Sequence, residues 1–116
     1  MTKAAEKIIV ALDVATKAEA VALVEELRKQ ISIFKIGLQL YTAEGPAVVH
    51  EVLKKDVKVF LDLKLHDIPN TVGRAVESAA QLGVQMLTIH LSAGTEMIRA
   101  AAGARKNNLS ILGVTV

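Results

Sequence analysis

Hydrophobic and polar residues alternate between two patterns along the chain. Short apolar runs typical of buried strands begin about every 25 residues and cover 8–12, 31–36, 57–65, 84–91 and 110–116. The stretches between them repeat apolar residues at the three- and four-residue spacing of an amphipathic helix, as in Val72, Ala75, Val76, Ala79 and Ala80. Strands alternating with helices of this length predict repeated βαβ units and a parallel sheet.

The sequence also indicates where several of the helices lie. Thr16 and Glu19 have the spacing of a capping box, which predicts a helix to about Lys29. We expect further helices to begin near Gly45-Pro46 and near Asn70, and another to carry the apolar stripe Met97, Ile98, Ala101 and Ala102. Right-handed crossovers leave two main α/β folds, an open doubly wound sheet or part of a (β/α) barrel. The first strand–helix turn, residues 12–16, lacks a glycine-rich phosphate loop, which disfavours a dinucleotide-binding fold.

Charged residues gather at the ends of the predicted strands. Side chains alternate across a strand, so residues 57–65 divide into an apolar face and a face that carries Asp62 and Lys64, with His66 following. Neighbouring strands end in the same way, in Asp13, Lys35 and His90. In a barrel these ends meet at one mouth, where barrel active sites lie.

One charged residue at a strand end is usually solvated, but four strands with alternating signs predict a shared site around Lys35, Asp62 and Lys64. His66 and His90 could belong to this site, but either could instead be a hydrogen-bonded histidine in its wall or in a loop. His50 is expected on a helix surface.

The amino-acid composition argues against several classes of function. The chain of 116 residues has no cysteine, which excludes disulfides and thiolate metal sites and favours a cytoplasmic location. A net charge of +2 and three aromatic residues disfavour a nucleic-acid surface. No run approaches the ~20 apolar residues of a membrane span, so no membrane partner is expected.

Two motifs resemble those of bacterial orotidine 5'-phosphate decarboxylases. They are Phe34–Gly37 (FKIG) and Asp62–Thr71 (DLKLHDIPNT), and the similarity extends from Ala11-Leu12-Asp13 to Gly113–Val116. The Asp-x-Lys-x-x-Asp spacing is shared with sugar-phosphate relatives, whereas Ile-Pro-Asn-Thr and Lys35 are more specific. The resemblance implies a (β/α)8 TIM barrel without cofactor or metal, which converts orotidine 5'-monophosphate to UMP and CO2 at a homodimer interface.

The resemblance also implies roles for individual residues. Lys64 is the expected general acid, Asp62 lies against the departing carboxylate, and Lys35 and Asp67 complete an alternating charge network. The residues expected to bind substrate are Asp13 and Lys35, at the ribose, with Asp67, Ile68 and Thr71 contributed to the partner subunit's site.

The chain carries four βα units and a fifth strand, so we expect residues 1–116 to form a single N-terminal half-barrel domain. The loops that bind phosphate in this family come later in its barrel, so the chain alone is expected to be inactive. One alternative is a non-catalytic half-barrel module that self-associates, two copies closing a barrel or forming a larger oligomer. A metal-dependent sugar-phosphate lyase or synthase is disfavoured, because Lys35 stands where those relatives place a metal-binding carboxylate.

Overall fold

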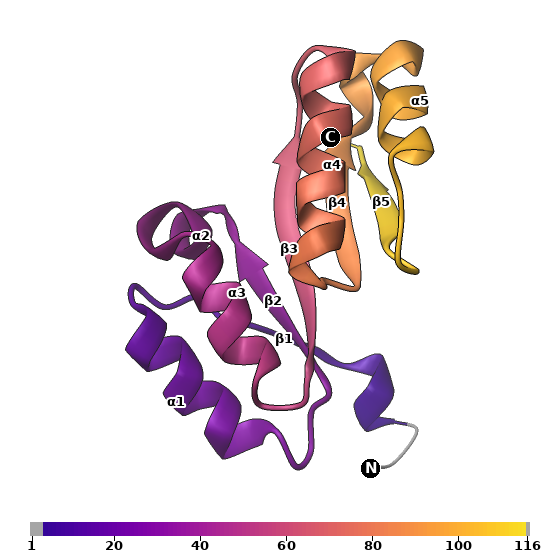
Figure 1. Ribbon diagram of the computed structural model, residues 1–116. Helices are drawn as coiled ribbons and strands as arrows, with labels where there is room; N and C mark the ends of the chain where they lie inside the picture. Colours follow the sequence, from indigo (N-terminus) through magenta and orange to yellow (C-terminus); the bar gives the residue numbers. More distant parts are fainter. Residues whose placement is uncertain (1–3, 116) are drawn as a thin grey trace. The chain divides into compact units, whose positions relative to one another are not determined.

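The computed structural model describes residues 4–115, in which parallel strands alternate with helices (Figure 1). The strands form a five-stranded sheet in the order β1-β2-β3-β4-β5. In chain order the elements are η1 (Ala5–Lys7), β1 (Ile9–Ala11), α1 (Lys17–Leu27), β2 (Ile33–Gly37), α2 (Leu38–Glu44), α3 (Pro46–Leu53), β3 (Lys58–Leu65), α4 (Pro69–Leu82), β4 (Met86–His90), η2 (Leu91–Ala93), α5 (Thr95–Gly103) and β5 (Ser110–Val114). The chain divides into two compact units, one up to Phe60 and one from Leu61 onwards.

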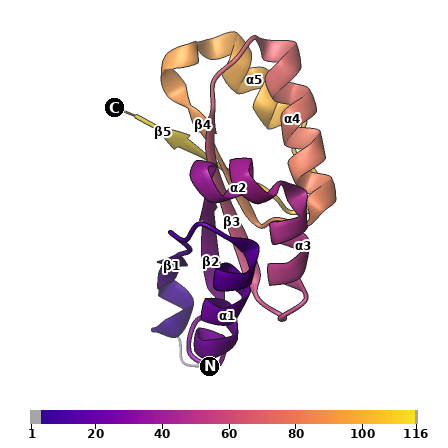
Figure 2. The same ribbon diagram turned by 90° about the vertical axis from the view of Figure 1, so that its left-hand side faces the viewer.

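In the first unit, β1 pairs with β2 in parallel, with Ile9 opposite Ile33 and Ala11 opposite Lys35. Helices α1 and α3 lie side by side (Figures 1 and 2). Alternate residues of β2 point into the core, as the strand pattern predicted. The fully buried side chains of this unit include Val24, Phe34, Ile36, Val48, Val49 and Val52.

The start of α1 confirms the predicted capping residue. The Thr16 hydroxyl accepts the Glu19 backbone N–H at 3.2 Å and donates to the Glu19 carboxylate at 3.0 Å. A second acid also caps this helix, because Glu44 Oε2 accepts the Lys17 N–H at 2.6 Å. Backbone N–H groups in the first turn of α1 are therefore capped both by Thr16, just before the helix, and by Glu44, at the end of α2.

Helix α2 is an element that the sequence analysis did not predict. It occupies seven residues directly after β2 and buries Leu40. Gly45 separates it from α3 with φ of +66°, a conformation that favours glycine, and Pro46 then begins α3. The segment after β2 is therefore a short helix followed by a sharp turn, and the predicted start of α3 at Gly45-Pro46 is confirmed.

In the second unit, β4 pairs with β5 in parallel, with Thr88 opposite Leu112. Helices α4 and α5 lie side by side in both views (Figures 1 and 2). The predicted stripe of α4 is confirmed, but Ala102 of the α5 stripe is exposed. The buried side chains of this unit include Val72, Val76, Ala79, Leu87, Ile89, Met97, Ala101 and Leu109. Among the described helices, none has the length and apolar character needed to cross a membrane.

Gly113 on β5 offers a test of how tightly this second unit is packed. A Cβ at Gly113 would come within 2.5 Å of Leu91 Cδ2, whereas a Cβ at Gly37 would meet nothing within 4 Å. We expect Gly113→Ala to lower the free energy of unfolding by about 1–3 kcal/mol through overpacking, and Gly37→Ala to change it much less. Urea denaturation measures both, and Leu91→Ala should relieve part of the Gly113→Ala effect. Equal effects of the two glycine substitutions would contradict this account.

Candidate functional site

The candidate site is built around a buried carboxylate near the end of β3. Val59 and Leu61, which belong to the predicted apolar face of this strand, are buried. Asp62 points to the opposite face and is nevertheless only 9% exposed. A carboxylate with so little access to water requires charged or hydrogen-bonding partners, because burying an uncompensated charge is costly.

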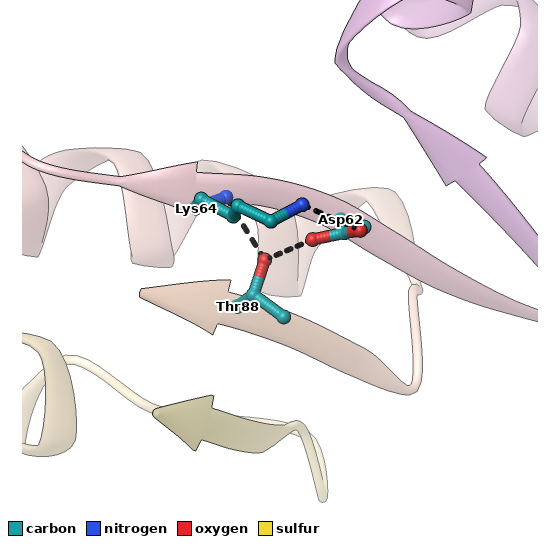
Figure 3. A network of polar contacts seen from close by, with 3 residues as sticks. All are labelled: Asp62, Lys64 and Thr88. Carbon is teal, nitrogen blue, oxygen red and sulfur yellow. Dashed lines mark hydrogen bonds and ion pairs between the residues drawn. The ribbon is translucent and has the colours of Figure 1, made fainter. Parts of the chain in front are cut away.

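Two partners of Asp62 come from β3 and β4 (Figure 3). Lys64 Nζ lies 2.9 Å from Asp62 Oδ2, and the Thr88 hydroxyl donates to Asp62 Oδ1 at 2.8 Å. The Lys64 backbone N–H in turn donates to Thr88 Oγ1 at 2.9 Å. The three residues therefore form a closed ring of contacts, and the predicted Asp62–Lys64 pair is present.

Lys64 is unusual in both its backbone and its exposure. Its φ of +50° lies in the left-handed region, which costs a residue with a side chain about 1–3 kcal/mol. Its side chain is 51% exposed, compared with 11% for that of Asp62. The ammonium group is thus anchored to a buried carboxylate and remains accessible to a small molecule.

The end of β3 and the residues that follow it line a cavity of about 280 Å³. Three predicted site residues, Lys64, Asp67 and Thr71, line it. Ile68 is 65% exposed, and its backbone N–H donates to Asp67 Oδ1 at 2.7 Å. The remaining lining residues are Leu63, Leu65, His66, Val72 and Ala75.

Asp13 and Lys35 belong to the first unit. Lys35 lies in the middle of β2 and is half-buried, and its carbonyl accepts the Leu12 N–H at 2.9 Å. Asp13 comes directly after Leu12 in the chain and is exposed. The β1–β2 pairing therefore brings the chain around Asp13 next to Lys35, and a shared role with Asp62 and Lys64 stays a prediction.

The two histidines that the sequence left open lie close together. The rings of His66 and His90 are 5.5 Å apart between centroids and inclined by 50°. His90 Nδ1 accepts the Ser92 N–H at 3.3 Å and lies 2.6 Å from Ser92 Oγ. His50 is exposed on α3, as expected. Within residues 4–115, no three side chains from histidine, cysteine, aspartate and glutamate gather into a metal-binding group.

Thr88 is the site residue that sequence reasoning missed. Alternation along β4 places Thr88 on the same face as His90, but the sequence analysis assigned it no role. A hydroxyl on a buried strand next to a predicted charged site could have pointed to it, because a buried hydroxyl needs hydrogen-bond partners. Which partners it meets depends on the pairing of β4 with β3.

A charged pair at the carboxyl end of a strand in a parallel α/β sheet is the arrangement of barrel enzymes. The chain belongs to the orotidine 5'-phosphate decarboxylase / HUMPS family, whose family model matches residues 6–116. This confirms the family that the two motifs indicated.

Two curated relatives illustrate the similarity. The orotidine 5'-phosphate decarboxylase of Carboxydothermus hydrogenoformans is 48% identical over 96% of this chain, which corresponds to 49% of the relative. That of Heliobacterium modesticaldum is 47% identical over 90% of this chain and 43% of the relative. The chain thus spans about half the length of the curated relatives that it matches.

Solved structures confirm the half-barrel fold. The crystal structure of orotidine 5'-phosphate decarboxylase from Lactobacillus acidophilus matches 93% of this chain and 52% of its own, with a TM-score of 0.82 and 29% identity. The enzyme from Pyrococcus horikoshii OT3 matches with a TM-score of 0.80 at 24% identity, and that likeness concerns the fold alone.

The pairing of Asp62 and Lys64 predicts a measurable coupling. In a double-mutant cycle with Asp62→Asn and Lys64→Met, we expect a coupling free energy of about 1 kcal/mol, reduced by the solvent exposure of Lys64. Urea denaturation of the four proteins measures it. Lys58 is an exposed lysine on the same strand, so the cycle with Lys58→Met should show no coupling. Equal coupling in both cycles would refute the specific pair.

Proposed function

We propose that Asp62 and Lys64 are the proton-donating part of an orotidine 5'-monophosphate decarboxylase site, which releases CO2 and forms UMP without a cofactor. The proposal rests chiefly on one observation, the 2.9 Å contact between a buried carboxylate and a half-exposed ammonium at the carboxyl end of β3. Family membership supports it.

The chemistry requires this combination of charges. When the carbon–carbon bond to the substrate carboxylate breaks, its electron pair stays on C6 of the pyrimidine and CO2 leaves. An ammonium group already fixed near C6 stabilises that charge as it develops. Lys64 then transfers a proton from Nζ to C6, which yields UMP and a neutral lysine.

Asp62 contributes in two ways. Its carboxylate contacts the Lys64 ammonium at 2.9 Å and holds it in one orientation. It also places a negative charge beside the substrate carboxylate, and that repulsion disappears when CO2 departs, so it acts on the ground state more than on the transition state.

The remaining predicted residues complete the proposed site. Lys35 and Asp67 extend the alternating charges, and Asp13 and Lys35 bind the ribose hydroxyls. Asp67, Ile68 and Thr71 act in the site of a partner subunit. The exposure of Ile68 and the presence of Asp67 and Thr71 in the lining of one cavity are compatible with this role.

The proposed site needs more than these residues supply. In this family's barrel the phosphate and pyrimidine contacts lie in later strands and loops, and the chain spans about half of its curated relatives. Binding energy from a remote phosphate supports the reaction at C6, so we propose that the 116 residues alone have little turnover. The proposed location of the complete enzyme is the cytoplasm.

A chimera provides the sharpest test. The chain is joined to the C-terminal half of the Carboxydothermus hydrogenoformans relative, and consumption of orotidine 5'-monophosphate is followed by absorbance. We expect turnover in the chimera, a loss of about 10²–10⁴-fold or more in kcat/KM with Lys64→Ala, and near-normal rates with Lys58→Ala. The 116-residue chain alone should match its own Lys64→Ala variant.

Three outcomes of the chimera assay oppose the proposal. A folded chimera without turnover would argue against the site, and turnover that survives Lys64→Ala would remove Lys64 from the acid role. Turnover that appears only with added Mg²⁺ would favour the sugar-phosphate type of metal-dependent site instead.

A second candidate function is self-association of the half barrel. β1 and β5 are the terminal strands of the sheet order, and both carry exposed apolar residues, Ile9 on β1 and Leu112, 41% exposed, on β5. A cavity of about 290 Å³ beside β5 has a largely apolar lining of Ile89, Leu91, Ile98, Ala102, Arg105, Ile111 and Gly113. Open sheet edges with apolar side chains favour pairing with another chain. We propose a second copy of this chain as that partner.

Leu112→Lys tests the self-association. We expect light scattering to show a dimer or larger oligomer for the chain at micromolar concentration and a shift toward monomer for Leu112→Lys, because a charge on an edge strand opposes pairing. Gln81→Lys on the exposed face of α4 adds the same charge and should leave the assembly unchanged. A monomeric unsubstituted chain would exclude this function.

A further inference from the structure

We infer that Thr88 is a positioning residue that holds Asp62 and Lys64 in their working arrangement. This inference rests on the proposed function, since Lys64 is the proposed acid. Thr88 is 3% exposed and lies on β4, the strand next to β3 in the sheet order. Figure 3 shows its hydroxyl between the backbone of Lys64 and the carboxylate of Asp62.

The direction of each hydrogen bond follows from the donors available. The Lys64 backbone N–H can only donate, so Thr88 Oγ1 accepts from it, at 2.9 Å. The hydroxyl proton is then directed to Asp62 Oδ1, 2.8 Å away. A chain from amide to hydroxyl to carboxylate results, and each bond in such a chain polarises the next.

The same hydroxyl acts on both members of the pair. By binding Oδ1, it orients the carboxylate so that Oδ2 faces the Lys64 ammonium. By accepting the Lys64 N–H, it stabilises the left-handed backbone from which the lysine side chain turns back toward Asp62. Thr88 therefore acts through Asp62 and Lys64 rather than on the substrate.

Threonine suits this task better than a longer polar residue. Its branched Cβ restricts χ1, so the hydroxyl position is defined with little loss of side-chain freedom. Its methyl group also suits a buried position, since Thr88 is only 3% exposed.

A purely structural role for Thr88 predicts something different. In that case its loss would weaken the whole of β4, and every amide in the strand would exchange more quickly. A positioning role predicts that the change is concentrated at Lys64. Amide hydrogen exchange and acetylation of the Lys64 side chain separate the two, and neither requires activity.

The test compares Thr88→Val and Thr88→Ser in the 116-residue chain. Valine keeps the shape and removes the hydroxyl, and it should speed Lys64 amide exchange about tenfold and Lys64 acetylation about two- to fivefold. Serine keeps the hydroxyl and should leave both rates close to those of the unsubstituted chain. Ile89→Val is the control for general weakening of β4.

Specific results would overturn the inference. These are unchanged Lys64 rates in Thr88→Val, or an increase spread evenly over β4 as in Ile89→Val. If Thr88→Val does not fold, Thr88→Ser decides: fast Lys64 exchange there would show that the methyl group matters and the hydroxyl does not.

Activity in the chimera separates this inference from the proposed function. There, Thr88→Val should lower kcat by about tenfold with little change in KM, and Thr88→Ser should restore it. An inactive chimera with a selective Lys64 effect would contradict the decarboxylase proposal and leave the positioning role standing. An active chimera that Thr88→Val does not slow would support the decarboxylase proposal and contradict the positioning role of Thr88.

Discussion

The burial of the Asp62 carboxylate is the constraint on which the site depends. A charge with this little access to water is tolerated only where other groups compensate it. The Lys64 ammonium and the Thr88 hydroxyl do so from fixed positions on neighbouring strands. The requirement to compensate this buried acid therefore also determines where a lysine lies, and that lysine is the proposed proton donor.

Strain and exposure at Lys64 fit the same account. Its left-handed backbone is costly, yet it is retained where the amide meets the Thr88 hydroxyl and the side chain meets Asp62. The ammonium stays half exposed at the strand end. In the proposed site, the second unit supplies this cation for the negative charge that develops at C6, and we propose that other groups hold the rest of the substrate.

The sequence predicted the features that follow from periodicity. The alternation of strands and helices, the cap at Thr16, and the Asp62–Lys64 pair could all be derived from spacing, because period and face are local properties of the chain. Helix α2 was missed because seven residues between two glycines show too little periodicity. The role of Thr88 and the left-handed φ of Lys64 depend on how two strands meet, which no local pattern records.

The central claim is that Lys64 is held ready to protonate C6, and a crystal structure of the chimera with UMP bound tests it most directly. The account predicts that Lys64 Nζ keeps its contact with Asp62 and lies about 3–3.5 Å from C6 of the pyrimidine. A pyrimidine bound away from β3, or a Lys64 side chain turned away from both Asp62 and C6, would contradict it.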